Sequence, residues 1–90
     1  METVVITGAT SGIGLSTTRL FLNKGWGVMM ASNQREQGEK LCAKFAEQFG
    51  NDRVAFTCTD VSDAASVAAL HDATFTKFSS VTSLVNDAEL

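Results

Sequence analysis

The sequence predicts an α/β fold with the element order βαβαβαβ. Short apolar runs alternate with longer amphipathic stretches along the whole chain. Strands that alternate with helices favour a parallel sheet whose strands are joined by right-handed crossovers. The strands are continuous apolar runs, which is typical of strands covered by helices on both faces. We therefore expect a three-layer α/β/α arrangement around four parallel strands.

The expected strands are short and rich in valine, isoleucine and threonine, which favour extended backbone. They are Thr3–Thr7 (TVVIT), Gly27–Ser32 (GVMMAS), Arg53–Thr59 (RVAFTCT) and Ser83–Asn86 (SLVN). The last of these would form an edge of the sheet. An edge strand leaves backbone N–H and C=O groups unpaired beside Leu84 and invites association with another copy.

Each expected helix shows apolar residues at a spacing of three or four. The first helix carries Ile13, Ser16, Thr17, Leu20, Phe21 and Lys24 at this spacing, with Gly25 as a candidate C-cap. The second helix has an apolar face formed by Leu41, Cys42, Phe45 and Phe49, and Gly50 would end it.

The third helix is expected to begin after Ser62, whose hydroxyl suits an N-cap. Asp63 would place negative charge at the positive end of the helix dipole. The predicted apolar stripe of this helix consists of Val67, Leu70, Thr74, Phe75 and Phe78.

Composition narrows the class of protein and of partner. Ninety residues are enough for one small domain. Seven basic and ten acidic residues give a net charge of −3 without a basic block, which argues against nucleic acid or an anionic membrane as partner. No apolar run reaches the roughly 20 residues that a membrane span needs. Cys42 and Cys58 lack the spacing of a zinc site or a disulfide scaffold, so we expect reduced thiols in the cytoplasm.

A glycine cluster lies between the first strand and the first helix. Gly8 would permit a tight turn, Gly12 would let the backbone approach a diphosphate, and Gly14 would allow close packing of helix on strand. The helix N-terminus offers N–H groups and a positive dipole end to an anion. The hydroxyls of Thr10 and Ser11 add possible donors. The segment therefore predicts a nucleotide phosphate site.

Three motifs in order along the chain resemble those of the short-chain dehydrogenase/reductase family. They are T-G-A-T-S-G-I-G from Thr7, T-D-V-S from Thr59 and L-V-N-D-A-E from Leu84. The resemblance covers the whole chain. It implies half of a Rossmann fold with strand order 3-2-1-4, in which residues 1–90 form a single truncated dinucleotide-binding domain.

The resemblance also assigns residues to parts of an NAD or NADP cofactor. Gly8, Gly12, Ile13 and Gly14 would surround the diphosphate. Asp60 and the backbone of Val61 would hold the adenine. Asn86 and Ala88 would lie near the nicotinamide ribose.

The choice between NAD and NADP depends on the end of the second strand. An acidic residue there commonly binds the ribose 2′-hydroxyl of NAD, but Ser32 and Asn33 occupy this stretch. Arg35 lies nearby and could meet a 2′-phosphate, although it also suits an ordinary solvent-facing position. The sequence thus favours NADP slightly and leaves NAD open.

The chain departs from the family pattern in two ways. Asp87 and Glu89 replace an asparagine and a glycine of the last motif, and Glu89 would bring negative charge near the cofactor path. The family's acid/base tyrosine and its lysine lie beyond the fourth strand, and these ninety residues contain no tyrosine. We expect a cofactor-binding module that is inactive alone; the alternative is a non-enzymatic oligomeric or interaction protein that has lost cofactor binding.

Overall fold

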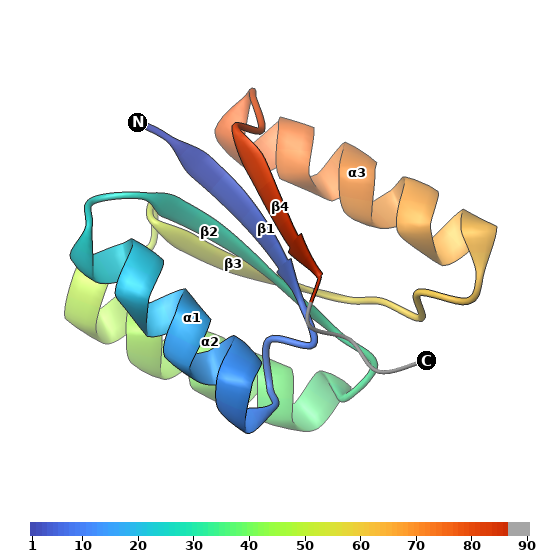
Figure 1. Cartoon of the computed structure of the whole chain (residues 1–90), viewed down its shortest axis with the longest axis horizontal. Coiled ribbons are helices and arrows are strands. Elements are labelled where there is room, and N and C mark those ends of the chain that lie inside the picture. Colours follow the sequence, from blue (N-terminus) through green and yellow to red (C-terminus); the bar gives the residue numbers. More distant parts are fainter. Residues whose placement is uncertain (87–90) are drawn as a thin grey trace.

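The structure is a computed structural model that describes residues 1–86, and it contains one parallel sheet of four strands in the order β3-β2-β1-β4 (Figure 1). The predicted fold class, strand order and element order are confirmed. The strands are β1 (Thr3–Thr7), β2 (Gly27–Ser32), β3 (Val54–Cys58) and β4 (Ser83–Asn86). The helices are α1 (Gly12–Asn23), α2 (Arg35–Phe49) and α3 (Ala64–Phe78).

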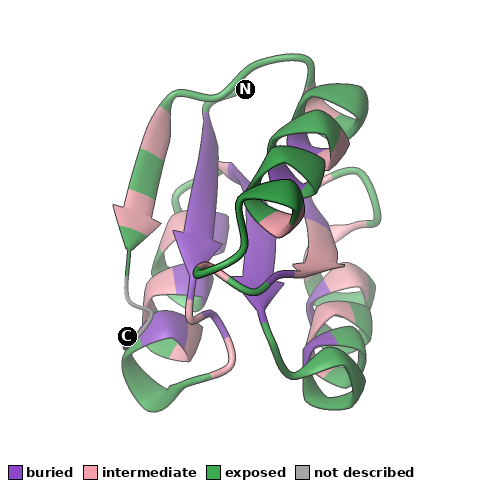
Figure 2. Ribbon diagram, turned by 90° about the vertical axis from the view of Figure 1, so that its right-hand side faces the viewer, coloured by how far each residue is buried: buried purple, intermediate pink, exposed green. Residues whose placement is uncertain are grey.

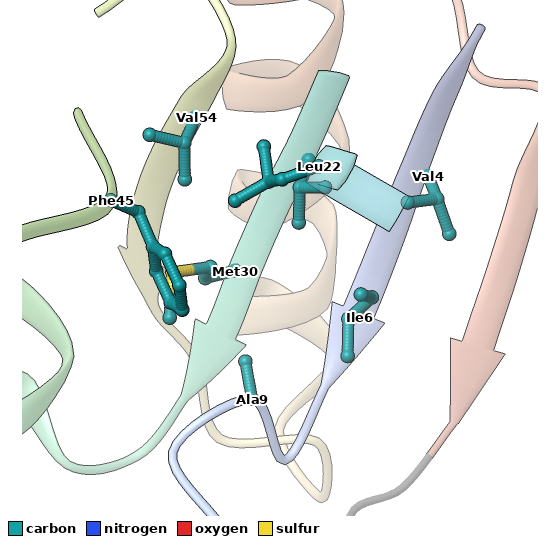
Figure 3. Packing of buried hydrophobic residues seen from close by; sticks show 8 residues of the cluster. Val4, Ile6, Ala9, Leu22, Met30, Phe45 and Val54 are labelled. Atoms are coloured by element: carbon teal, nitrogen blue, oxygen red, sulfur yellow. The ribbon is translucent and has the colours of Figure 1, made fainter. Parts of the chain in front are cut away.

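The helices form layers on both faces of the sheet, with α1 and α2 on one side and α3 on the other (Figure 1). Each side has its own apolar cluster. The cluster beneath α1 and α2 is built on Val4, Ile6, Ala9, Leu22, Val28, Met30, Phe45 and Val54 (Figure 3). The smaller cluster beneath α3 consists of Val5, Met29, Ala31 and Leu70. The predicted three-layer arrangement is therefore present.

The protection of the strands is uneven. Figure 2 shows β1 and β2 buried along their length, whereas β4 alternates between half-buried and exposed residues. Val85 packs against the cluster beneath α1 and α2. Leu84 pairs in register with Val5 and stays 64% exposed. Among residues 1–86, β4 pairs with β1 alone, so it forms the predicted sheet edge.

Two helices turn a different face to the core from the one the sequence suggested. In α1 the buried residues are Gly14, Thr18 and Leu22, while Ile13 and Leu20 are exposed. The polar Thr18 can be buried because its hydroxyl donates to the Gly14 carbonyl over 2.9 Å. Gly14 and Thr18 thus share the buried face of α1 with Leu22, and the exposed Ile13 and Leu20 misled the prediction of this face.

The predicted stripe of α3 is wrong at two positions. Leu70 and Thr74 are buried, but Val67 and Phe75 are 43% and 42% exposed. Thr74 is accommodated because its hydroxyl donates to the Leu70 carbonyl over 2.7 Å. The N-cap was also predicted wrongly: Asp63, and not Ser62, accepts a hydrogen bond from the Ala65 N–H.

The helix ends otherwise follow the sequence. Gly25 has a φ of 90° directly after the C-cap Lys24 of α1, and Gly50, with a φ of 111°, is the C-cap of α2. Trp26 packs edge-on against Phe21 beside the first of these turns, with ring centroids 4.9 Å apart. None of the helices within residues 1–86 is long and apolar enough to cross a membrane.

The side chain of Arg53 makes three hydrogen bonds at the amino end of the sheet. The Arg53 guanidinium donates through Nη2 to the carbonyls of Leu22 and Trp26, each over 2.7 Å, and through Nε to the Trp26 carbonyl over 2.9 Å. Leu22 belongs to the last turn of α1, at the negative end of the helix dipole, and its carbonyl also accepts from the Gly25 N–H over 3.1 Å. Arg53 thereby links the end of α1 to the start of β3.

Replacing Arg53 tests this link. Arg53→Met keeps apolar bulk but removes the guanidinium donor from the Trp26 carbonyl and leaves the Leu22 carbonyl with the Gly25 N–H, 3.1 Å away. We therefore expect the free energy of unfolding to fall by about 1–3 kcal/mol in urea titrations. Lys40→Met is the control, since it removes only the exposed 3.4 Å pair with Glu36, worth about 0.5 kcal/mol or less. Equal losses in the two variants would contradict the role given to Arg53.

Candidate functional site

A pocket of about 660 Å³ lies at the carboxyl ends of β1, β2 and β3. Its walls come from the segments that follow these strands, because parallel strands bring their carboxyl ends to one edge of the sheet. Its volume lies within the roughly 300–1,000 Å³ typical of small-molecule sites. Of the residues predicted from the sequence, it is lined by Gly8, Thr10, Ser11, Gly12, Ile13, Ser32, Asn33, Asp60 and Val61.

The glycine loop has the tight turn and close packing that its spacing predicts. Gly8 takes a φ of 64°, which favours glycine. A Cβ added to Gly14 would overlap the Gly8 carbonyl oxygen, so only glycine permits this approach of α1 to the loop after β1. Gly14 is buried and does not line the pocket. Its position sets the distance between α1 and the loop after β1.

The first turn of α1 presents backbone donors to the pocket. The Ser11 hydroxyl caps the helix: it accepts from the Gly14 N–H over 3.1 Å and donates to the Gly8 carbonyl over 2.8 Å. Helix geometry leaves the N–H groups of Gly12 and Ile13 without an acceptor in the helix, and no other described residue accepts from them. These two N–H groups stand at the positive end of the helix dipole. An anion in the pocket would complete this turn.

The hydroxyls of the loop serve the protein itself. Thr10 Oγ1 lies 2.8 Å from Ser32 Oγ, which joins the glycine loop to the end of β2. Ser32 Oγ also accepts from the Gln34 N–H over 3.0 Å. The sequence indicated that Thr10 and Ser11 offer donors to a ligand; in the structure both residues line the pocket, and both hydroxyls also make contacts that fix its shape.

Asp60 is fixed on the opposite wall by its own turn. Its Oδ1 accepts from the Ser62 hydroxyl over 2.7 Å and from the Ser62 N–H over 3.0 Å. The side-chain bond, followed by the backbone bond, lowers the pKa of the Asp60 carboxyl below its ordinary value of 3.8. The exposed carboxylate is therefore ionised at neutral pH and oriented before any ligand binds.

Besides Gly14, two predicted residues do not line this pocket, and a third lies outside the described residues. Arg35 projects along α2 and pairs with Glu39 over 3.7 Å. Asn86 is at the same end of the sheet, but its Oδ1 accepts from the Thr7 hydroxyl over 2.7 Å and it does not line the pocket. Ala88 lies outside the described residues, as do Asp87 and Glu89 of the same motif.

The sequence analysis missed residues on the side of the pocket formed by α2. Gln34 and Gln37 both line it, three positions apart on the first turn of the helix. Gln34 is the N-cap of α2 but makes no side-chain capping bond. The sequence did hold a signal for them, because two glutamine side chains three positions apart follow the second strand directly. Ala31, Thr59 and Ser62 complete the lining.

Residues 2–90 match the family model described as short chain dehydrogenase. The chain belongs to the short-chain dehydrogenase family. Serine 3-dehydrogenase from Agrobacterium fabrum is 40% identical over 90 residues, which are 98% of this chain and 33% of that protein. This member of the short-chain dehydrogenase family thus spans about a third of the length of that relative.

Solved structures of other family members share the fold. L-sorbose reductase from Gluconobacter frateurii, complexed with NADPH and L-sorbose, is 29% identical with a TM-score of 0.91 over 99% of this chain and 34% of its own. A family member from Burkholderia phymatum in complex with NAD is 29% identical with a TM-score of 0.86, covering 92% and 29% of the two chains. Both cofactors therefore occur among the similar structures.

The residues of this short-chain dehydrogenase chain fit the diphosphate of a dinucleotide. A Cβ added to Gly12 would meet no protein atom within 4 Å, so the backbone there is open to a ligand. The two N–H groups supply donors, and the dipole favours negative charge at the same point. Asp60, which also lines the pocket, adds an oriented acceptor for a donor group elsewhere on the dinucleotide, such as an amino group.

The carboxylate of Asp60 gives a pH-dependent prediction. Because the folded-state pKa is the lower one, the carboxylate stabilises the fold above pH 3.8, and this contribution is lost as the pH falls through the folded-state pKa. Ser62→Ala removes the hydroxyl bond and should raise the pKa of Asp60 toward 3.8. An NMR titration of the carboxyl carbon measures both values. Identical titration curves in the two proteins would show that the Ser62 hydroxyl does not act on Asp60.

Proposed function

We propose that this chain binds the dinucleotide NAD or NADP through its diphosphate and adenosine parts. The N–H groups of Gly12 and Ile13 bind the diphosphate, and Asp60 with the Val61 backbone holds the adenine. Ser32 and Asn33 lie where the adenosine ribose would be. The observation that carries the proposal is the pair of unpartnered N–H groups on one wall of the pocket, opposite the oriented Asp60 carboxylate.

The position of Asn86 suggests a contact with the nicotinamide end of the cofactor. Asn86 ends β4 next to the end of β1, on the side of the sheet where the pocket opens. Its amide is oriented by Thr7, which donates to Oδ1 and leaves Nδ2 to donate elsewhere. We assign Asn86 and Ala88 to the nicotinamide ribose.

The proposed role of these ninety residues alone is binding without turnover. A bound nicotinamide cofactor supplies or accepts a hydride, and the chain holds it in place. The acid/base tyrosine implied by the family resemblance is absent, because the sequence contains no tyrosine. The absence of a nucleic-acid or membrane partner stays part of the proposal because the chain has no basic block. The cytoplasm as compartment stays part of it because the spacing of Cys42 and Cys58 suits reduced thiols.

Gly12 and Gly14 provide a matched test. Gly12→Ala meets no protein atom, so we expect the melting temperature to be unchanged or raised while the affinity for NADH and NADPH falls at least about tenfold. Gly14→Ala would instead force α1 away from Gly8 and lower the free energy of unfolding by about 2 kcal/mol or more. Calorimetric titration and urea unfolding of both variants measure these effects.

Ser16→Ala, an exposed substitution on α1 outside the pocket, is the control for the binding experiment. Undiminished affinity in Gly12→Ala would refute binding at the first turn of α1. Absence of binding to the unaltered protein would refute the proposed function itself.

A second proposal concerns association of the chain with another copy through β4. Leu84 faces the same side of the sheet as Val5, toward the layer of α3, and is 64% exposed. Antiparallel pairing of two β4 strands about a two-fold axis normal to the sheet would place the two Leu84 side chains opposite each other. Such pairing satisfies the open edge and supports the alternative of an oligomeric interaction protein.

Leu84→Lys tests the edge. A lysine on this strand places like charges together in the paired arrangement, so we expect a dimer to become a monomer in light scattering. Leu20→Lys changes an equally accessible leucine on α1 and should leave the assembly intact. A monomer at every concentration in the unaltered protein would rule out the β4 dimer, and dissociation caused by Leu20→Lys would move the contact elsewhere.

A further inference from the structure

The wall of the pocket next to the adenosine ribose carries no positive charge. We infer that this chain binds the dinucleotide with a free ribose 2′-hydroxyl, NAD(H), in preference to the 2′-phosphorylated form, NADP(H). This inference rests on the proposed function and narrows it to one of the two cofactors. It reverses the slight preference for NADP drawn from the sequence, which rested on the missing acidic residue at the end of the second strand and on the nearby Arg35.

The charges of the pocket are one-sided. Among its lining residues within 1–86, Asp60 alone is charged, and its lowered pKa keeps it ionised. A phosphate monoester carries a charge of roughly −1.5 to −2 at neutral pH. A 2′-phosphate would therefore meet a carboxylate across the pocket and no lysine or arginine to offset the loss of its hydration.

The cations at the start of α2 do not line the pocket. Arg35 and Lys40 lie along a shallower depression on α2 that shares only Gln34 and Gln37 with the pocket. Each cation pairs with a carboxylate one helical turn away, Arg35 with Glu39 over 3.7 Å and Lys40 with Glu36 over 3.4 Å. The first two turns of α2 thus offer no net positive charge to a phosphate.

The side chains that do face the ribose end suit a hydroxyl. Asn33, Gln34 and Gln37 line it, and each amide can donate and accept, as a sugar hydroxyl does. A fully ionised phosphate monoester only accepts hydrogen bonds. The amide oxygens of these side chains would therefore find no donor on it and would repel its charge.

Ser32 limits the room at this wall. It is 7% exposed, and its Oγ is held between Thr10 Oγ1 at 2.8 Å and the Gln34 N–H at 3.0 Å. Swinging Ser32 outward to meet a phosphate would release the contact between the glycine loop and β2. The wall is therefore both uncharged and fixed by internal hydrogen bonds.

The test is a calorimetric titration of the unaltered chain with NADH and with NADPH at low and high ionic strength. We expect NADH to bind at least about tenfold more tightly, because the charged hydrogen bonds that a 2′-phosphate requires are missing. We also expect the preference for NADH not to grow with salt, since no cation is present whose attraction salt would screen. Equal or tighter binding of NADPH would overturn the inference but leave the proposed function standing. Binding of neither cofactor would remove both.

Single substitutions test whether Arg35 contacts a 2′-phosphate. Arg35→Gln and Lys44→Gln remove the same charge from α2, and we expect both to leave the ratio of NADH to NADPH affinity within about twofold of the unaltered chain. Asn33→Arg adds a cation to the pocket wall and should shift the ratio toward NADPH about tenfold or more. A selective loss of NADPH binding in Arg35→Gln alone would show that Arg35 reaches the 2′ position and would overturn the inference.

Discussion

The approach of α1 to the loop after β1 is the constraint on which the site depends. Gly14 stands where any side chain would overlap the Gly8 carbonyl oxygen, and Gly8 itself turns with a positive φ. Together the two glycines set the height of the helix above the sheet. At that height the Ser11 cap engages Gly14 and Gly8, and the N–H groups of the next two residues point past the end of the sheet into the pocket. A helix displaced outward would lose the cap and the donor geometry together.

Hydrogen bonds of serine and threonine hydroxyls hold the segments that line the pocket in place. Ser32 at the end of β2 is tied to Thr10 on one side and to the start of α2 on the other, so one small side chain sets the spacing of two walls. Ser62 performs the corresponding task for Asp60 on the third wall. These contacts are short-range and internal, and they leave the N–H groups of α1, the Asp60 carboxylate and the amides of Asn33, Gln34 and Gln37 available to a ligand. The hydroxyls that suggested ligand contacts in the sequence thus also hold the pocket together.

The sequence predicted the sheet well because its strands are continuous apolar runs that both helix layers cover, and no other placement buries them. It predicted the helix faces poorly where a threonine lies in the core. Thr18 and Thr74 satisfy their hydroxyls within their own helices and pack closely, which displaces Ile13, Leu20, Val67 and Phe75 toward solvent. Hydrophobicity alone cannot rank such positions. At the site, steric rules predicted the roles of the glycines in the turn and the packing, whereas Arg35 pairs with Glu39 one helical turn further on and does not line the pocket.

The pocket offers its proposed ligand two kinds of group, the backbone N–H groups of α1 and the side chains at the start of α2. Attraction for a diphosphate comes from the backbone and the dipole of α1, so it follows from the fold and survives changes of most side chains. In the proposed binding mode, discrimination at the ribose comes from the start of α2, where the side chains of residues 34–37 are exposed and the packing constraint falls on the buried Gly38. The N-cap of α2 has no side-chain capping bond, and its only tie to β2 is the Ser32 contact with the Gln34 N–H. Charge placed on that turn therefore alters cofactor choice without disturbing the core, and in this chain the paired carboxylates Glu36 and Glu39 cancel the cations that would otherwise attract a 2′-phosphate.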